Sequence, residues 1–578
     1  MHLPEVRRAA VAAIAAVVAM GLTGCVGLPT TGPVREGAVP EREPAAPLTL
    51  PEEPIADGTP EDIVQGFLRA GAAGLSDDFR AARTHLTSGA TWEPQAQVLI
   101  SGAPPQLRYD NAGTVIATVP VAAIVDGSGA YAEVAARTPQ VLEFELVQDA
   151  TDQWRISSAP QGVVMSPRDF EQLYRDVPVY FASPDLTHLV PDLRHFPARN
   201  IETLAARALF AGPSLWLRDA VESGIPEGAQ LTVSAVTVEE TVATVDLAAP
   251  AIRAETNRNL LQVQLEATLR GLPTVITEVL VTVGGLPWEN QRGGIGDLII
   301  NPPPVAGPFV LLDDGRIAVV EQGEVLPLAD VASLEGLSAN SLALSPDVEV
   351  RVVRSGTSRI LLLPAGGAEP VELIPAPDDL IPPPDDLIQP PVDLIPPSVD
   401  RFGWVWSGPE ASAGTLLAVT ADGVQTEITA DWLEGSEVRS LRVARDGTRV
   451  AVVSTDESGR VSVDVAGVVR DGLDRPLRLG ERWQIGASLV TASEVSWVDE
   501  VTVAVLGTTS AGGSAAMHRV PLGGVTSALS IVENAKGIAT GRGDRALYLV
   551  DLEGQLWLRQ GQVWRPAATG VSDVVFPG

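Results

Sequence analysis

Hydrophobic positions recur with both helical and strand-like periods up to about residue 300, and with a strand-like period alone beyond it. A helix start is indicated at Thr59, Pro60 and Asp62, because Thr can cap a helix, Pro suits its first turn and Asp completes a capping box. The apolar positions that follow predict two amphipathic helices, within 63–68 and 79–86. Alternating runs then predict strands at 98–100, 114–119, 130–135, 141–147 and 153–156.

Helices followed by a curved antiparallel sheet resemble a small α+β domain of the NTF2-like type, which we expect over residues 59–165. Domains of that type often enclose an apolar cavity, and nothing in this segment marks such a cavity as catalytic. His85 follows the second helix. We therefore expect a histidine at the helix end or on the surface, rather than a catalytic group.

The next segment predicts a second α+β domain, expected over residues 166–300. The pattern indicates a strand at 176–181, a helix capped by Asn200, a hairpin at 231–247, a second helix at 260–269 and a strand at 275–283. This order, with the Ala211-Gly212-Pro213 stop and the Gly284-Gly285 end, resembles a GerMN domain, a family known from sporulation, germination and envelope lipoproteins. The resemblance implies a binding module, and Asp246 has no Ser or His pattern beside it.

Short apolar runs repeat through the C-terminal region, where helical periods stop. They begin near Phe309, Leu342, Trp404, Leu441, Val495, Gly537 and Val574. A period near 40–45 residues with four short strands per unit is typical of a β-propeller, and a pair of β-sandwiches is the alternative. We expect an all-β propeller over residues 301–578, with about six blades, although five or seven also fit. The strand near Val574 is expected to close the ring against the strand near Phe309.

A seven-residue repeat lies within this region, at residues 377–397. Its three copies are Pro-Asp-Asp-Leu-Ile-Pro-Pro and two close variants. Two or more prolines per copy exclude a helical coiled coil despite the heptad spacing. We expect a solvent-exposed loop produced by repeat expansion, and a docking site for a partner is the alternative.

The amino terminus has the organisation of an export signal. Arg7 and Arg8 precede a mostly apolar run of 14 uncharged residues, shorter than the roughly 20 that a transmembrane helix needs. The run leads into Leu22-Thr23-Gly24-Cys25, which resembles the lipobox of bacterial lipoproteins. The resemblance implies removal of residues 1–24, attachment of Cys25 to the lipid bilayer by a diacylglyceryl group and acyl chains such as palmitate, and a place on the outer face of the cell membrane. An ordinary secretory signal with a chance Cys is the alternative.

A proline-rich stretch follows this signal. Residues 25–58 hold seven prolines and no apolar period, which predicts an extended tether.

Composition excludes several functions. The 578 residues carry 73 Asp and Glu against 40 Lys and Arg, a net charge of −33, and Lys536 is the only lysine. Such a chain repels phosphate backbones, which argues against nucleic-acid binding. One Cys excludes a disulfide scaffold or Cys-based zinc cluster, and His188, His195 and His518 lack ligand-like spacing. No metal, cofactor or catalytic motif is found, and residues 541–546 are expected to form a turn rather than a dinucleotide-binding loop.

The order of lipobox, tether, NTF2-like domain, GerMN domain and propeller resembles the LpqB family of actinobacterial lipoproteins. Trp154-Arg155-Ile156, Ala211-Gly212-Pro213 and Trp404-Val405-Trp406 carry the local likeness. That family is associated with the MtrA–MtrB two-component system. The resemblance therefore implies a non-enzymatic lipoprotein that binds and modulates the extracellular part of a sensor histidine kinase in cell-envelope homeostasis. The alternatives are an envelope glycan or peptidoglycan binder and a propeller-based hydrolase, whose channel would present paired carboxylates or histidines.

Overall fold

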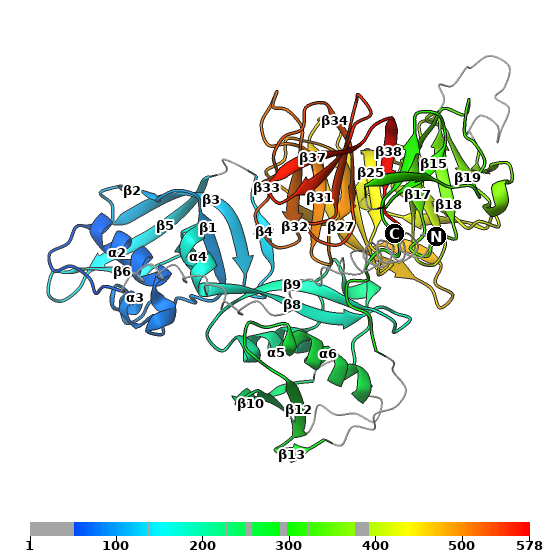
Figure 1. The fold of residues 1–578 in the computed structure, drawn as a ribbon. Coiled ribbons are helices and arrows are strands. Elements are labelled where there is room, and N and C mark those ends of the chain that lie inside the picture. The colour runs from blue at the N-terminus through cyan, green and yellow to red at the C-terminus, as the bar shows by residue number, and fades with distance from the viewer. Residues whose placement is uncertain are drawn as a thin grey trace, which may run out of the picture. The chain divides into compact units, whose positions relative to one another are not determined.

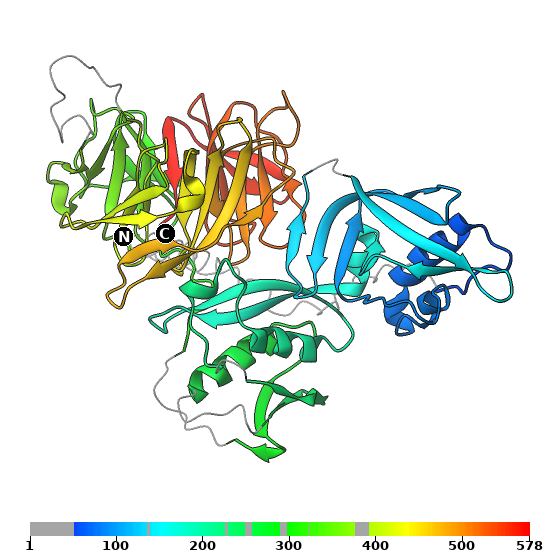
Figure 2. The same ribbon diagram turned by 180° about the vertical axis from the view of Figure 1, so that it is seen from behind.

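The computed structural model describes seven stretches of the chain, and Leu50–Gly578 forms one compact unit. The described residues are 51–135, 139–225, 229–248, 257–288, 297–321, 323–375 and 392–578, with the side chains of 233–235 excepted. The predicted signal peptide, Cys25 and the tether up to residue 50 therefore lie outside the described residues. Figures 1 and 2 show the ribbon from opposite sides.

The first region packs helices against a mostly antiparallel sheet, as the sequence predicts. Its elements are α2 (Pro60–Ala72), η1 (Gly74–Ser76), α3 (Arg80–Thr84), β1 (Gln97–Ser101), β2 (Gln106–Tyr109), β3 (Thr114–Asp126), β4 (Tyr131–Glu133), β5 (Pro139–Gln148), β6 (Trp154–Ser158) and β7 (Val163–Met165). The capping box is confirmed, because Asp62 N donates to Thr59 Oγ1 (3.2 Å) and Thr59 N donates to Asp62 Oδ2 (3.0 Å). The sheet runs β6-β5-β3-β1-β7, with β2 and β4 also paired to β3.

His85 lies at the end of α3, as expected, but it is not on the surface. Its side chain is 1% exposed and Nδ1 lies 3.1 Å from the Ala81 carbonyl oxygen. Burial lowers the pKa of the imidazole. The ring fits because Gly66 in α2 has no Cβ, which would stand 2.6 Å from His85 Nε2. Of the two expected placements, the helix end is confirmed and the surface is not, because a glycine one helix away leaves room for the ring.

The second region places two helices between a hairpin and a small sheet (Figure 1). Its elements are α4 (Pro167–Leu173), β8 (Tyr174–Ala182), β9 (Leu189–Pro197), α5 (Ile201–Ala211), η2 (Arg218–Ala220), β10 (Leu231–Glu239), β11 (Val242–Leu247), α6 (Arg258–Arg270), β12 (Glu278–Val283) and β13 (Leu286–Pro287). Strands β8 and β9 pair with each other, and the sheet order is β10-β11-β12-β13 with β11 and β12 parallel. Asn200 occupies the helix start, but its backbone is left-handed (φ 59°) and its side chain makes no capping bond.

The third region is a six-bladed propeller. Most blades are four-stranded sheets. Two neighbouring blades are joined into one nine-stranded sheet, because β24 pairs with β28. The strands are β14 (Phe309–Leu312), β15 (Ile317–Glu321), β16 (Glu324–Pro327); β17 (Ala339–Leu344), β18 (Arg351–Ser355), β19 (Arg359–Leu362), β20 (Val371–Ile374); β21 (Ser398–Val399), β22 (Val405–Ser407), β23 (Thr415–Val419), β24 (Gln425–Thr429); β25 (Glu437–Val443), β26 (Arg449–Thr455), β27 (Val461–Arg470), β28 (Pro476–Leu479), β29 (Trp483–Ile485); β30 (Thr491–Trp497), β31 (Thr502–Thr508), β32 (Ala516–Pro521), β33 (Ser527–Ala528); β34 (Ala535–Thr540), β35 (Leu547–Asp551), β36 (Leu556–Gln560), β37 (Val563–Ala568); and β38 (Val571–Val575).

The last strand closes the ring, as predicted. Strand β38 pairs antiparallel with β14, with Val574 opposite Val310 and Val575 opposite Phe309. In both views the red β38 lies among the green strands from the start of the propeller. The inner strands around the axis are β17, β21, β25, β30, β34 and β38. The apolar runs at Phe309 and Trp404 therefore mark second strands of their blades rather than first strands.

The third copy of the heptad repeat is partly in the core, contrary to the expectation of an exposed loop. Leu394 is 3% exposed and Ile395 is fully buried. Leu394 packs in the same cluster as Leu373 and Ile374, which lie just before the repeat. Residues 376–391, which hold the first two copies, lie outside the described residues. The third copy is thus part of the blade. We call its buried Leu394-Ile395 pair, and the Leu373-Ile374 pair before the repeat, the Leu-Ile anchors.

A buried aspartate ties two blades together. Asp400 Oδ1 accepts from the backbone N–H groups of Phe402 (2.9 Å) and Trp404 (3.0 Å). Its Oδ2 accepts from Trp406 Nε1 (2.9 Å) and from Arg470 Nη2 (2.6 Å), and both charged side chains are at most 2% exposed. Arg470 belongs to β27 in the next blade. Four donors on one buried carboxylate explain why the Trp404-Val405-Trp406 stretch has a fixed place in the fold.

Candidate functional site in the propeller channel

The axis of the propeller holds a polar pocket of about 290 Å³, which we call the channel mouth. Residues of the inner strands line it, together with one residue of β18 and with Pro396, which precedes β21. The lining is Asn340, Ser341, Arg354, Pro396, Arg439, Ser440, Arg442, Ser493, Glu494, Lys536, Gly537, Ser572 and Asp573. Four side chains in this set are cationic and two are carboxylates. The channel mouth is therefore rich in positive charge on a chain whose net charge is −33.

Arg442 and Glu494 form the inner wall of the channel mouth. Arg442 Nη1 donates to the carbonyl oxygens of Pro397 (3.1 Å) and Leu441 (3.0 Å), which fixes the guanidinium. Its Nη2 lies 3.5 Å from Glu494 Oε1, and Glu494 Oε2 accepts from the Ile538 backbone N–H (2.9 Å). Burial raises the pKa of Glu494 to about 7, although Arg442 opposes this rise. Glu494 can therefore hold or release a proton near neutral pH.

Asp573 is the second carboxylate of the channel mouth. Its Oδ2 accepts from the Leu342 backbone N–H (2.7 Å), and burial raises its pKa. Gly537 separates it from Glu494, because a Cβ on residue 537 would lie 3.6 Å from Glu494 Oε2 and 4.0 Å from Asp573 Oδ1. The missing side chain of Gly537 keeps the space between the two carboxylates open.

The outer part of the channel mouth holds two arginines, each close to a glutamate, and one lysine. Arg354 is held by Asn340 Oδ1 (2.8 Å) and the Leu394 carbonyl oxygen (2.7 Å), and it lies 3.4 Å from Glu410. Arg439 pairs with Glu437 at 2.7 Å and lies 3.8 Å from Glu410. Lys536 makes no hydrogen bond or ion pair with any described residue. The ammonium of the chain's only lysine is thus available to a ligand.

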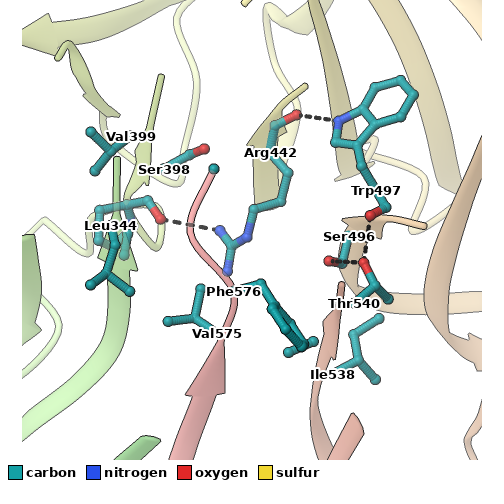
Figure 3. A pocket seen from close by; sticks show the side chains of 14 residues that line it. Leu344, Ser398, Val399, Arg442, Ser496, Trp497, Ile538, Thr540, Val575 and Phe576 are labelled. Atoms are coloured by element: carbon teal, nitrogen blue, oxygen red, sulfur yellow. Dashed lines mark hydrogen bonds between the residues drawn. The ribbon is translucent and has the colours of Figure 1, made fainter. Parts of the chain in front are cut away.

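The channel narrows beyond Arg442 to a cavity of about 20 Å³ (Figure 3). The Arg442 guanidinium reaches across it toward the Pro397 carbonyl, and Phe576 and Val575 lie below. Trp497 Nε1 donates to the Arg442 carbonyl oxygen (3.0 Å), and Thr540 Oγ1 donates to the Trp497 carbonyl oxygen (2.6 Å). The space beyond Arg442 is therefore much smaller than the channel mouth.

The loops that follow the inner strands contact the β8–β9 hairpin. Tyr180 Oη donates to Glu500 Oε1 (2.9 Å), and the Glu500 carbonyl oxygen accepts from Arg449 (2.5 Å). Arg449 is itself paired with Asp446 at 2.6 Å. Because these loops follow the strand ends opposite the channel mouth, the hairpin leaves the channel mouth uncovered.

Glu494→Gln is expected to remove a pH-dependent loss of stability. Because folding raises the pKa of Glu494 from 4.5 to about 7, the folded state keeps a proton that the unfolded chain has lost within this window. The free energy of unfolding should fall as pH rises through that window, by about 3 kcal/mol, since one pH unit of pKa difference corresponds to about 1.4 kcal/mol.

Denaturant unfolding at about pH 5 and about pH 8 measures this change. The Gln variant should gain stability over the parent at the higher pH and differ little at the lower one. Glu481→Gln, at an exposed position, is the control and should behave as the parent does. An equal pH dependence in parent and Glu494→Gln would contradict the assignment.

The histidines that the sequence left without a role are buried and structural. His188 and His195 are both 8% exposed, and His518 is 2% exposed. His195 packs beside Tyr131 and Phe170, and burial lowers its pKa to about 4. Residues 541–546 form a turn before β35, as predicted.

Two features can be stated only for the described part of the chain. Within it, no group of three or more His, Cys, Asp or Glu side chains is placed to hold a metal ion. Across the same residues, the helices are all too short or too polar to cross a bilayer. Cys25, the one site residue that the sequence predicts, lies outside these ranges and stays a prediction.

The sequence did not identify the channel mouth. Its lining residues come from segments spread over residues 340–573, and each segment contributes only one to three of them. The sequence offered one signal for this site, which is its single lysine. Lys536 stands out because all the other basic residues among the 40 are arginines.

Three family models match the described regions in order. Residues 53–171 match the N-terminal domain of Lipoprotein LpqB, residues 178–289 match the Germane domain of sporulation and spore germination, and residues 315–577 match the Lipoprotein LpqB β-propeller domain. Lipoprotein LpqB of Cutibacterium acnes is 28% identical over 88% of this chain and 87% of its own. Lipoprotein LpqB of Streptomyces coelicolor is 27% identical over 96% of both chains. The chain belongs to the LpqB family.

Other relatives and one solved structure complete the comparison. Lipoprotein LpqB of Thermobifida fusca is 27% identical over 87% of this chain and 88% of its own. A crystal structure of catalytically inactive virginiamycin B lyase from Staphylococcus aureus covers 46% of this chain, with 13% identity and a TM-score of 0.29, a likeness too low to inform function. The predicted LpqB resemblance is thus confirmed for all three folded regions.

Proposed function

We propose that this chain is a non-enzymatic lipoprotein, anchored through lipid on Cys25, that binds and modulates the extracellular part of a sensor histidine kinase. The partner that the family association favours is the kinase of the MtrA–MtrB system. The observation that carries the proposal is the domain order, since all three modules follow one another in a chain that aligns over 88% of its length with a protein named Lipoprotein LpqB. A tethered chain with two binding-type modules suits recognition outside the membrane.

An uncovered sheet face supports a protein partner. Helices α5 and α6 cover one face of the β10–β13 sheet, and the other face carries the pairs Val242–Glu278 and Thr244–Leu280. We call this the outer sheet face. Leu280 is 45% exposed there. A face that mixes exposed apolar and charged side chains resembles the surfaces used in non-obligate protein interfaces.

Site-specific crosslinking in living cells tests the partner. A photo-reactive amino acid at Leu280 should capture the kinase ectodomain. The matched control is Leu473, an 87% exposed residue on a propeller turn, where no kinase capture is expected. Capture of other proteins but not the kinase at Leu280 would contradict the proposed partner, and equal capture at both positions would contradict the outer sheet face.

A second candidate function has one observation in its favour. Glu494 and Asp573 provide a carboxylate pair in the propeller channel, and both pKa values are raised by burial. Two carboxylates with raised pKa values could serve as acid and base in hydrolysis of an envelope glycan. Incubation of the full chain with cell-wall fragments tests this alternative. Turnover that Glu494→Gln abolishes would establish a hydrolase, and absence of turnover in the parent chain would set it aside.

A further inference from the structure

The channel mouth concentrates the positive charge of an acidic protein. Arg354, Arg439, Arg442 and Lys536 line it, against the two carboxylates Glu494 and Asp573. The whole chain has the opposite balance, with 73 acidic and 40 basic residues. A pocket whose lining holds more cationic than anionic side chains attracts an anion.

The cations of the channel mouth divide into fixed and available groups. Arg354 and Arg442 each donate to backbone carbonyl oxygens, at 2.7 Å and at 3.0 to 3.1 Å, so their guanidinium groups are held in place before any ligand arrives. Lys536 has no hydrogen bond or ion pair among the described residues. Arg439 is 44% exposed at the rim, where it pairs with Glu437 at 2.7 Å and lies 3.8 Å from Glu410. Fixed cations lower the ordering cost of binding, and the ammonium of Lys536 supplies the free contact.

The carboxylates favour one class of anion. Glu494 and Asp573 are held by backbone N–H groups at 2.9 Å and 2.7 Å, on either side of Gly537. A dianionic phosphate would be repelled by both, whereas a monoanionic carboxylate is repelled less and forms paired hydrogen bonds with guanidinium groups. The remaining oxygens of Glu494 and Asp573 can accept hydrogen bonds from hydroxyl or amide groups of the same ligand.

We propose that the channel mouth is a binding site for a small carboxylate-bearing ligand, such as a sugar acid. The carboxylate lies between Lys536, Arg439 and Arg354, and the hydroxyl groups face Glu494 and Asp573 across Gly537. The pocket volume of about 290 Å³ is at the lower end of the range for small-molecule sites. This site goes beyond the role proposed above, because a free small molecule, not the partner protein, occupies it.

Calorimetric titration of the full chain in detergent tests the site. Glucuronate is the main probe, glucose is its neutral analogue, and inorganic phosphate is the competing anion. Glucuronate should bind and glucose should not. Lys536→Gln should weaken glucuronate binding by about tenfold or more, a change equal to about 1.4 kcal/mol. Lys536→Arg should restore most of the affinity.

Two further variants separate the site from general charge and from misfolding. Arg542→Gln removes one positive charge from an exposed turn away from the channel mouth and should leave binding unchanged. Gly537→Ala adds a methyl group at ordinary contact distance, so it should fold and yet weaken binding. The proposal is overturned if glucuronate does not bind the parent chain, if phosphate binds as tightly as glucuronate, or if Arg542→Gln and Lys536→Gln weaken binding equally.

Discussion

Replacing Cys25 by Ala is expected to move the protein from the membrane fraction to the soluble fraction completely. Cys25 is the only cysteine in the sequence, so no other thiol can take the lipid. Burial of acyl chains contributes about 0.8 kcal/mol per methylene, and two chains anchor a protein stably whereas one does so marginally. Fractionation of cells followed by immunoblotting measures the distribution.

Val26→Ala, which leaves the thiol in place, is the matched control and should stay with the membrane. Retention of Cys25→Ala in washed membranes would contradict the lipid anchor. Release from the membrane with signalling fully retained would confirm that Cys25 carries the lipid. It would also show that the anchor is not needed for the proposed function.

Asp400→Ala is expected to destabilise the propeller by about 3–5 kcal/mol. The substitution leaves Arg470 buried without its carboxylate. It also leaves Trp406 Nε1 and two backbone N–H groups without their hydrogen-bond acceptor. Removing one partner of a buried ion pair costs this much because the other charge stays out of water. Thermal unfolding followed by tryptophan fluorescence measures the loss, and Trp406 itself reports on the site.

Two variants bracket this expectation. Asp400→Asn keeps an oxygen acceptor but loses the charge, so it should fall between the parent and Asp400→Ala. Asp314→Ala breaks the pair with Arg316, whose side chains are 53% and 56% exposed, and should leave the unfolding midpoint unchanged. An unchanged midpoint for Asp400→Ala would mean that water reaches Arg470 and that the network carries little stability.

Much of the fold could be predicted because local patterns agree with it. The capping box at Thr59 and the hairpin that turns at Glu240 follow from residue types at short spacing. The closure of β38 on β14 follows from the regular recurrence of short apolar runs along the C-terminal region. The blade expected to begin near Trp404 begins earlier, at β21, and the difference has a physical reason. Strand β21 is only Ser398–Val399, whereas its neighbour β22 is buried on both sides and has the stronger apolar signal.

The channel mouth could not be predicted because it depends on register. Arg442, Glu494, Lys536 and Asp573 come from four strands of four blades, and each points to the axis only because its blade packs in one orientation. Periodicity shows which residues of a strand share a face, but it does not show which face meets the axis. The burial of His85 had a similar origin, since the gap left by Gly66 lies on another helix.

The buried Leu-Ile anchors bear on how this gene can change. Leu373–Ile374 before the heptad copies and Leu394–Ile395 at their end stand in the same acidic-Leu-Ile sequence as the copies between them. Gain or loss of one unit by slippage during replication is a change of seven codons that keeps the reading frame and leaves a Leu-Ile pair at each anchor. Doubling a loop adds only about 0.6 kcal/mol of closure cost. A change in the number of units is therefore expected to leave the packing of both anchors, and of the blade that holds them, unchanged.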